Sequence, residues 1–440
     1  MSWVELPAPS WSAAAVLTAL HDEPRPFALE GSGSVSGDGL GRASYVGASP
    51  REQLTIDRRD AATAWRRFAD WLAARQAEAP TVGEPAIVGF ATYEAGRLAM
   101  APPLSLPPDT LGLPLFDWAC YGALFRRDEV TGACAVIGQS EAEAEALLAR
   151  LVARVPTTKP PPPLAPRPFV AEWGDRAYQE LVVKIVDYLR AGDAYQVNLT
   201  MQLRAPLPLA EALAAYLAVR RSFEAPLGGY LRLADVALLS NSPELLLRRR
   251  GTTVESRPIK GTARRSEDPA LDLAGATGLR QSSKDAAEHV MIVDLVRHDL
   301  GRVAVTGSVR VEGMMRLLTL PTVHHLVSTV CAEVPAALDT ATLLGAVLPG
   351  GSITGAPKRR AMEIIDELEG RERGVYCGAF GWIAPNGDCD LALPIRTAVA
   401  TRGELVLGVG GGIVVDSDPA AELAECRMKA SAFTRALGGR

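Results

Sequence analysis

Hydrophobic residues recur at helical spacing in the part of the chain that follows residue 170. Between residues 175 and 192 the recurring positions are Tyr178, Leu181, Val182, Ile185 and Leu189. Steps of three and four residues place such side chains on one helix face, and Gly192 closes the segment. The same reasoning predicts helices over residues 61–76, 141–155, 282–300, 354–368 and 419–437.

Apolar runs with strand character alternate with these helices. They predict strands over residues 86–93, 195–203, 230–239, 245–254, 376–383, 391–400 and 404–410. Long strands alternating with helices favour an α+β (mixed α/β) architecture. A proline run at residues 156–168 is typical of a linker, so we divide the chain into residues 1–155, this linker and residues 169–440.

The composition is that of an ordinary globular protein and excludes several classes. Hydrophobic residues make up 48% of the 440 and the net charge is −5, so dominant disorder is excluded. The absence of a long apolar run or a basic run predicts no membrane span and no nucleic-acid partner. Because the N-terminus lacks a basic signal-peptide start and the six cysteines form no C-x-x-C pair, we expect a cytoplasmic protein.

Lysine is scarce in this chain. Of the 46 basic residues six are lysines, namely Lys159, Lys184, Lys260, Lys284, Lys358 and Lys429. Unlike arginine, lysine can lose its proton and act as a nucleophile or base. Lys260 lies in the segment 257–264 near a predicted strand end, where desolvation would make it nucleophilic. The alternative is an exposed lysine in a turn.

Two further groups of residues have the chemistry of a binding site. The glycine-rich segment 350–358 opens a predicted helix, whose free N–H groups suit a carboxylate or phosphate. A tight turn capped by Thr354 would explain the same residues. Carboxylates on two predicted helices, Glu288 and Asp294 on one and Glu422 and Glu425 on the other, would suit Mg²⁺, bound partly through substrate oxygens. The alternative there is a solvated face with an ordinary Glu425–Lys429 pair.

Taken together, these segments resemble the chorismate-utilising enzymes, which include anthranilate, aminodeoxychorismate, isochorismate and salicylate synthases. The resemblance covers roughly residues 173–434, and more faintly residues 29–50 and 89–97. Its motifs are Ser242-Pro-Glu244, Arg257-Pro-Ile-Lys-Gly-Thr262, Met291-Ile-Val-Asp-Leu295, Val323-His-His-Leu-Val-Ser328, Pro349-Gly-Gly-Ser-Ile-Thr-Gly-Ala-Pro-Lys358 and Ile395-Arg-Thr397. It implies two packed antiparallel-rich β-sheets flanked by helices, with strands of the N-terminal region joining the same sheets.

The resemblance also implies roles for individual residues. Glu288 and Glu425 match the family's Mg²⁺ ligands. Glu244 matches the general acid that helps the ring 4-hydroxyl to leave, and His325 matches a histidine that lines the ring. The matched substrate-binding positions are Thr262, Thr354, Gly355, Tyr376, Arg396, Gly411, Gly412 and Lys429. Such a site suits chorismate, because a dianion needs cations, helix N-termini and a metal in one pocket.

Within this family, Lys260 indicates the reaction. Anthranilate synthases usually carry alanine there, whereas aminodeoxychorismate synthases carry a lysine understood to attack ring C2 before ammonia enters at C4. Isochorismate and salicylate synthases activate water with a lysine where this chain has Gln196. The resemblance therefore favours component I of an aminodeoxychorismate synthase, serving p-aminobenzoate and folate synthesis. The alternatives are component I of an anthranilate synthase and a catalytically silent chorismate-binding subunit.

Two further expectations concern partners and ligands. Because the chain has no Gly-x-Cys-x-Gly glutaminase motif, a separate glutamine amidotransferase would supply the ammonia. Relatives often hold tryptophan between the N-terminal region and the core. The corresponding positions here are Ser32, Arg42, Ala43, Ser44, Tyr45, Pro226, Leu227 and Gly228. The stretch 31–41 departs from the family, so we do not predict control by tryptophan. His298 and Pro394 also depart from the family's pattern, without replacing an assigned residue.

Overall fold

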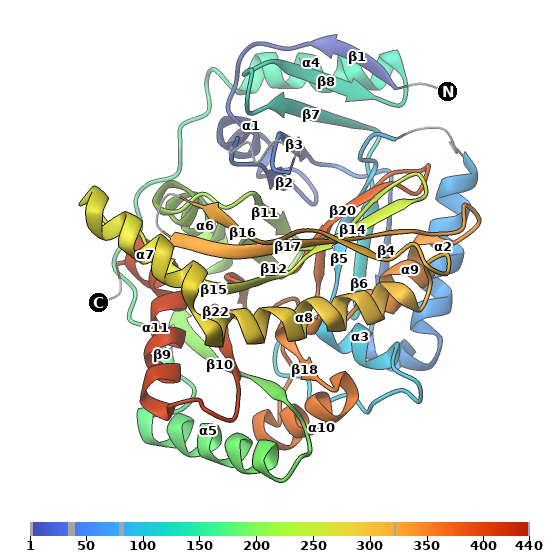
Figure 1. Ribbon diagram of the computed structural model, residues 1–440. Coiled ribbons are helices and arrows are strands. Elements are labelled where there is room, and N and C mark those ends of the chain that lie inside the picture. The colour runs from blue at the N-terminus through green and yellow to red at the C-terminus, as the bar shows by residue number, and fades with distance from the viewer. Residues whose placement is uncertain (1–2, 34–39, 79–82, 321–322, 439–440) are drawn as a thin grey trace.

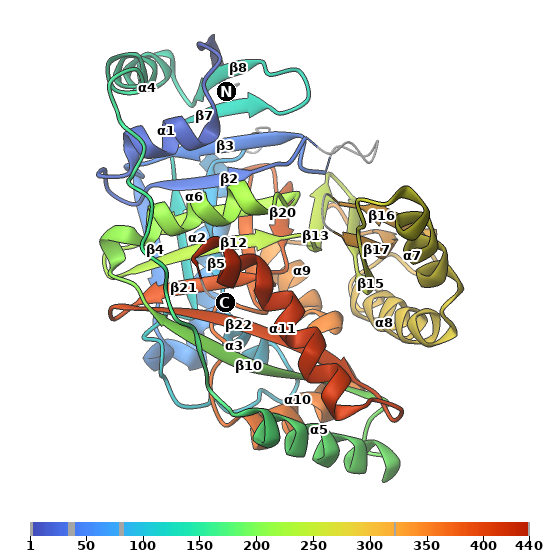
Figure 2. The ribbon, with the colours of Figure 1, turned by 90° about the vertical axis from the view of Figure 1, so that its left-hand side faces the viewer.

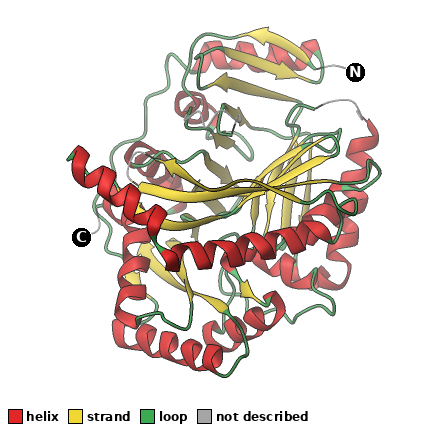
Figure 3. Ribbon diagram, viewed as in Figure 1, coloured by secondary structure: helices red, strands yellow, loops and turns green. Residues whose placement is uncertain are grey.

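Two large antiparallel sheets form the centre of the molecule, and helices cover their outer faces (Figures 1 and 3). The computed structural model describes residues 3–33, 40–78, 83–320 and 323–438. The predicted α+β class with two packed antiparallel-rich sheets is confirmed.

The first sheet has twelve strands, in the order β1-β8-β7-β3-β2-β11-β12-β21-β22-β10-β18, with β9 beside β10. Its strands are β1 (Val4–Pro7), β2 (Phe27–Glu30), β3 (Ala43–Gly47), β7 (Ala123–Asp128), β8 (Cys134–Gly138), β9 (Val170–Ala171), β10 (Gln196–Pro206), β11 (Leu227–Arg232), β12 (Val236–Ser242), β18 (Gly355–Ala356), β21 (Thr397–Thr401) and β22 (Glu404–Ile413). The pairing of β2 with β11 joins the segment before the proline-rich stretch 156–168 to the segment after it.

The second sheet has ten strands, in the order β15-β17-β14-β13-β20-β19-β5-β6-β4, with β16 beside β17. Its strands are β4 (Glu52–Ile56), β5 (Ile87–Ala91), β6 (Phe116–Cys120), β13 (Leu245–Arg250), β14 (Thr253–Arg257), β15 (Ile259–Arg264), β16 (Arg310–Thr319), β17 (Val323–Glu333), β19 (Ala379–Ile383) and β20 (Cys389–Ala392). Here too the two parts of the chain meet, because β5 pairs with β19.

Helices flank both sheets. They are α1 (Ala13–Leu20), α2 (Ala64–Glu78), α3 (Tyr93–Leu98), α4 (Glu141–Arg154), α5 (Asp175–Arg190), α6 (Ala212–Ser222), α7 (Pro269–Gln281), α8 (Ser283–Gly301), α9 (Thr340–Val347), α10 (Lys358–Glu369) and α11 (Pro419–Ala436), with short 3-10 turns η1 (Arg58–Thr63), η2 (Leu209–Glu211) and η3 (Gly351–Ile353). Within the described residues, none of these helices has the length and apolar character needed to cross a bilayer.

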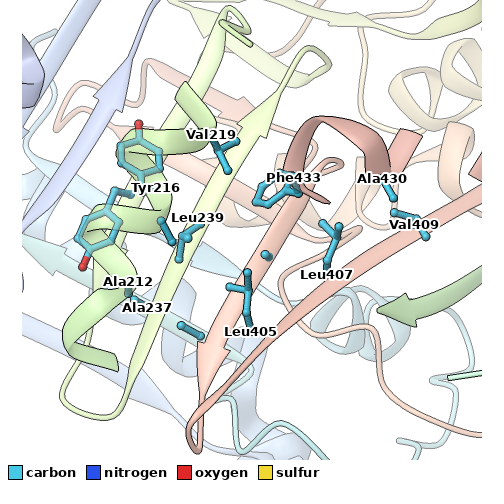
Figure 4. Close-up of a cluster of buried hydrophobic side chains, with 14 of the residues drawn as sticks. Ala212, Tyr216, Val219, Ala237, Leu239, Leu405, Leu407, Val409, Ala430 and Phe433 are labelled. Atoms are coloured by element: carbon cyan, nitrogen blue, oxygen red, sulfur yellow. The ribbon is translucent and has the colours of Figure 1, made fainter. Parts of the chain in front are cut away.

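Among the described residues, three large layers of apolar side chains and one small cluster hold the sheets and helices together. One lies between the two sheets, where Phe90 of β5 and Phe380 of β19 meet Leu238 of β12. The other two lie under the helices on the outer faces. Figure 4 shows part of one of them, with Tyr216 of α6 and Phe433 of α11 beside the first sheet. Each fully buried side chain of this size contributes about 1.5–3 kcal/mol.

Three strand predictions were wrong because each ran across a turn. Residues 230–239 and 245–254 each span parts of two strands, which are joined by a turn. In the second case Gly251 supplies the turn, with a φ of +58°. Residues 391–400 leave the second sheet after β20 and enter the first sheet as β21. Hydrophobic content alone does not reveal such a break, since both flanking strands are buried.

The helix predicted over residues 354–368 was also too long. It begins at Lys358, and Gly355 and Ala356 form the short strand β18 against β10. Thr354 is therefore not the helix cap, and Pro357 precedes the first helical residue. The remaining predicted helices and strands are present, with ends that differ by no more than three residues.

Arg373 lies buried where the two sheets and α10 meet. It is 2% exposed and donates hydrogen bonds to Glu369 (2.7 Å), to the carbonyl of Asn198 on β10 (2.8 Å) and to the carbonyl of Ile353 (2.7 Å). Its guanidinium carbon lies 4.8 Å from the ring centroid of Tyr93 on α3. The side chain of Arg373 thus joins the end of α10, strand β10, the loop at Ile353 and helix α3.

Glu94 on α3 completes this junction. The backbone N–H groups of Arg373 and Gly374 donate to its carboxylate at 2.8 Å and 3.1 Å. On the same helix, Gly96 lies against Pro349, and a Cβ there would come within 2.7 Å of the proline ring. The short helix α3 therefore fixes both the segment after α10 and the start of the glycine-rich loop.

Arg373→Met is expected to lower the free energy of unfolding by about 3–5 kcal/mol, because it removes the nearer of the two arginines that pair with the buried Glu369 carboxylate. Urea denaturation measures the change. The control is Arg176→Met, which removes an exposed pair with Glu180 and should cost less than about 1 kcal/mol. Equal losses of unfolding free energy in Arg373→Met and Arg176→Met would show that Arg373 does not hold these segments together.

Candidate active site

A cavity of about 510 Å³ is lined by residues of β15, α8, β22 and α11. Figures 1 and 2 show where these four elements lie in the fold. Of the thirteen predicted catalytic, substrate-binding and metal positions, ten line it. They are Glu244, Lys260, Thr262, Glu288, His325, Tyr376, Arg396, Gly412, Glu425 and Lys429. The chain thus gathers residues that span nearly two hundred positions in one concave site.

Strand β15 supplies two of these side chains. Lys260 and Thr262 both face the cavity, and the register with β17 shifts between them at Gly261, whose φ is +77°. A β-bulge of this kind re-aims the side chains beside it. It places Thr262 directly opposite His325 on β17.

Lys260 forms an ion pair with Glu288 of α8. The Nζ to Oε1 distance is 2.7 Å, and the two side chains are 11% and 16% exposed. Gly412 on β22 permits this approach, because a Cβ there would lie 2.9 Å from the Glu288 carboxylate and 2.4 Å from Nε2 of Gln196. Lys260 is therefore a sheltered, paired lysine and not an exposed lysine in a turn.

Glu244 is the most deeply buried carboxyl group of the cavity, at 4% exposure. Ser352 donates a hydrogen bond to its Oε1 at 2.5 Å. Burial disfavours the charged form and raises the pKa of Glu244 to about 7, although the bond from Ser352 and the Lys260 charge act in the opposite direction. A carboxyl group with this pKa is protonated in a large part of the molecules at neutral pH and can act as a general acid.

His325 is buried and neutral. Burial, assisted by the nearby charge of Arg396, lowers its pKa to about 3. Its Nδ1 lies 3.1 Å from the carbonyl of Gly261, which can only accept, so this nitrogen carries the proton. Nε2 is then free to accept from Arg396 at 3.3 Å. This geometry suits a side chain that orients Arg396. Because the low pKa keeps the imidazole neutral at neutral pH, His325 does not act there as an imidazolium proton donor.

Helix α11 brings a second Lys–Glu pair to the cavity. Lys429 lies 2.8 Å from Glu425 and donates to the carbonyl of Gly410 at 2.9 Å. The Lys429 charge lowers the pKa of Glu425. Glu422, one turn earlier, accepts a hydrogen bond from Ser417 at 2.6 Å and also lines the cavity.

The cavity offers oxygen donors that suit a hard cation. Glu288 and Glu425 both line it, but within the described part of the chain no three His, Cys, Asp or Glu side chains are grouped as a metal site. Mg²⁺ commonly binds through one or two carboxylates and takes its other oxygens from water and substrate. The two glutamates therefore fit Mg²⁺ as a partial set of ligands.

Three predicted positions do not line the cavity. Thr354 is fully buried and its hydroxyl donates to the carbonyl of Gly350 at 3.0 Å, within its own loop. Gly355 lies against Gln196, where a Cβ would come within 2.1 Å of the carbonyl oxygen. Gly411 is next to the lining residue Gly412. These residues shape the loop and the strand behind the site.

The sequence analysis missed several residues of this cavity. Asn198, Ser352, Gly408 and Met428 all line it. Gly408 leaves room for the ring of Tyr376, because a Cβ there would lie 2.3 Å from a ring carbon. Ser352 belongs to the motif at residues 349–358, but the motif alone does not show which of its residues lines the cavity.

Residues predicted for a tryptophan-like pocket surround a different cavity, of about 520 Å³. Six of the eight line it, namely Arg42, Ala43, Tyr45, Pro226, Leu227 and Gly228. Ser44 instead accepts a hydrogen bond from the N–H of Gly31, and Ser32 is not among the lining residues. Part of the glycine-rich stretch, residues 34–39, lies outside the described residues. Occupation by tryptophan stays a prediction.

Comparison with known proteins identifies the family. Residues 31–435 match the family described as chorismate binding enzyme, so the chain belongs to it. Anthranilate synthase component 1 of Thermus thermophilus is 42% identical over 363 residues, covering 80% of this chain and 77% of that protein. Aminodeoxychorismate synthase component 1 of Salmonella typhimurium is 39% identical over 348 residues, covering 77% and 73%.

Solved structures agree with this assignment. The crystal structure of anthranilate synthase component I from Streptococcus pneumoniae superposes with a TM-score of 0.79 at 28% identity, covering 90% of this chain and 92% of that one. The protein is thus a chorismate-binding enzyme whose relatives are named for two different synthases.

A role of Glu244 as general acid predicts that the turnover number for chorismate falls as pH rises through about 7, because only the protonated carboxyl group can donate. Total ammonium is adjusted at each pH so that free ammonia stays constant. Glu244→Gln should lower turnover by about 10²–10⁴-fold and abolish this pH dependence.

Ser352→Ala provides the matched control. Its hydroxyl favours the charged form of Glu244, so removing it should move the midpoint of the pH profile upward. If the midpoint of the pH profile is unchanged in both Glu244→Gln and Ser352→Ala, the profile reports the titration of a group other than Glu244.

Proposed function

We propose that this chain is component I of an aminodeoxychorismate synthase, converting chorismate and ammonia into 4-amino-4-deoxychorismate. The observation that carries the proposal is Lys260, which lies inside the cavity, in an ion pair with Glu288. A lysine in this place can form a bond to a ring carbon, which an alanine cannot. The buried acid Glu244 lines the same cavity.

The residues of the cavity divide the chemistry between them. Arg396 and Lys429 attract the carboxylates of the dianionic substrate. Protonated Glu244 gives its proton to the departing 4-hydroxyl, which leaves as water. The Lys260 amine attacks C2 as the ring double bonds shift, and ammonia then adds at C4 as the lysine nitrogen leaves. Because attack requires the neutral amine, Lys260 must leave its ion pair with Glu288 and lose a proton first.

We further propose that Glu288 and Glu425 hold Mg²⁺ together with oxygens of the substrate. The ion would neutralise a substrate carboxylate and so strengthen its binding among acidic side chains.

Gln196 favours ammonia over water as the incoming nucleophile. Its side-chain amide is fully buried, lies beside Gly412 and has no hydrogen-bond partner among the described residues. An amide is not a base and cannot activate water, whereas ammonia needs no activation. We propose that a separate glutamine amidotransferase delivers the ammonia, in the cytoplasm.

A second candidate is component I of an anthranilate synthase. It is favoured by the 42% identity to the Thermus thermophilus protein of that name. In this case Lys260 would only balance the charge of Glu288.

Product identity tests the proposal. The purified chain is incubated with chorismate, Mg²⁺ and excess ammonium, with and without aminodeoxychorismate lyase, and the products are identified by mass spectrometry. We expect p-aminobenzoate only when the lyase is present, and no product when EDTA removes the metal. Anthranilate and pyruvate formed without the lyase would establish the second candidate.

Two substitutions of Lys260 separate a nucleophile from a charge. If the amine attacks the ring, Lys260→Ala and Lys260→Arg should both lose amination by at least about 10³-fold while still binding chorismate. The arginine keeps the positive charge beside Glu288 but cannot act as the nucleophile. Normal rates in Lys260→Arg would contradict the covalent mechanism.

A further inference from the structure

A second cavity, of about 300 Å³, adjoins the active site on the far side of Arg396. Four residues line both cavities and form the wall between them, namely Thr262, Arg396, Met428 and Lys429. The remaining wall comes from the end of α6, from Arg264 and Val323 at the ends of β15 and β17, and from the last turns of α11. We call this cavity the antechamber.

The wall of the antechamber carries positive charge alone. Its lining includes Arg264, Arg396, Arg435 and Lys429, and no aspartate or glutamate is among the described residues that line it. In contrast, the active-site cavity has Asp285, Glu288, Glu422 and Glu425 among its lining residues. The active-site cavity also has the cations Lys260, Lys284, Arg396 and Lys429 in its wall, so its charges are mixed, whereas those of the antechamber are positive alone.

The three arginines of the antechamber lack acidic partners. Most arginines of this chain form ion pairs, such as Arg265 with Asp272, but within the described residues none of these three has a carboxylate within 4.0 Å. Arg435 donates only to Ser431 of its own helix. Arg264 and Arg435 are exposed, so their charge reaches the solvent. Although the net charge of the protein is −5, a cluster of arginines without acidic partners makes the local potential positive and attracts anions.

Arg396 stands at the passage between the two spaces. Its guanidinium carbon lies 5.0 Å from the ring centroid of Phe223, which lines the antechamber, and an NH₂ group contacts His325, which lines the active site. Burial lowers its pKa to about 10, so it remains charged at neutral pH. Met428 beside it is unbranched and flexible and can move to let a ligand pass.

We propose that the antechamber is an anion-binding entry site, in which Arg264 and Arg435 capture the dianionic substrate before Arg396 and Lys429 draw it into the active site. The proposal rests on chorismate as the ligand, which the family defines, and not on which product the enzyme forms. Capture of this kind raises the local substrate concentration and weakens as salt screens the charges.

The test compares wild type with Arg264→Glu/Arg435→Glu. Isothermal titration calorimetry gives the Kd for chorismate, and loss of chorismate absorbance gives kcat and KM. At low ionic strength we expect Kd and KM to rise about tenfold, with kcat changed less than about twofold. At about 0.5 M salt the difference should fall below about twofold.

Matched variants separate the charge of the antechamber from the net charge of the whole protein. Arg59→Glu/Arg176→Glu makes the same change in net charge at two exposed arginines outside both cavities and should bind chorismate as wild type does. Arg264→Lys/Arg435→Lys keeps the charge and should restore binding. An unchanged Kd in the Glu/Glu variant at low salt, or a loss that salt does not reduce, would overturn the proposal. The Kd is independent of product identity, so failure of the proposed reaction would leave this test intact.

Discussion

The buried guanidinium of Arg373 is the interaction on which the rest of this structure depends. It balances the charge of Glu369 and donates hydrogen bonds to a carbonyl on a strand of the first sheet and to the carbonyl of Ile353 in the glycine-rich loop. Its ring contact with Tyr93 adds α3, which follows a strand of the second sheet. Because a buried charge requires complete pairing, these segments can adopt only the arrangement that satisfies it. The loop that carries Ser352 to Glu244 is therefore fixed from behind, by residues that touch no substrate.

Charge compensation also organises the active site itself. Two lysines, Lys260 and Lys429, each have a glutamate at hydrogen-bond distance, whereas Arg396 has none. A dianion entering this cavity finds Arg396 without a carboxylate partner among the described residues, and two Lys–Glu pairs that can exchange partners. The raised pKa of Glu244 fits the same logic, since a further buried negative charge would repel the substrate.

The amino-acid sequence was sufficient for the fold class and for most of the site, because both depend on local chemistry. Helical spacing located α5 and α8 closely, and motif residues such as Lys260 and Glu288 lie in one cavity as predicted. The errors arose where tertiary contacts decide. A turn at Gly251 divides the predicted strand 245–254 into two strands, and Thr354 turns its hydroxyl into its own loop. No pattern in the sequence distinguishes Ser352 from Thr354, since only the path of the loop determines which of the two lines the cavity.

The order of strands in the second sheet has a consequence for synthesis of the chain. Strand β5 is complete after Ala91, but its partner β19 begins at Ala379. At about 5–20 residues per second, a ribosome needs about 15–60 s to make the intervening chain. During that time β4, β6 and β5 can pair with each other but leave one apolar edge of β5 open. An open edge of this kind is a template for association with other nascent chains. Residues 87–91 therefore keep an unpaired strand edge until residues 379–383 have emerged from the ribosome.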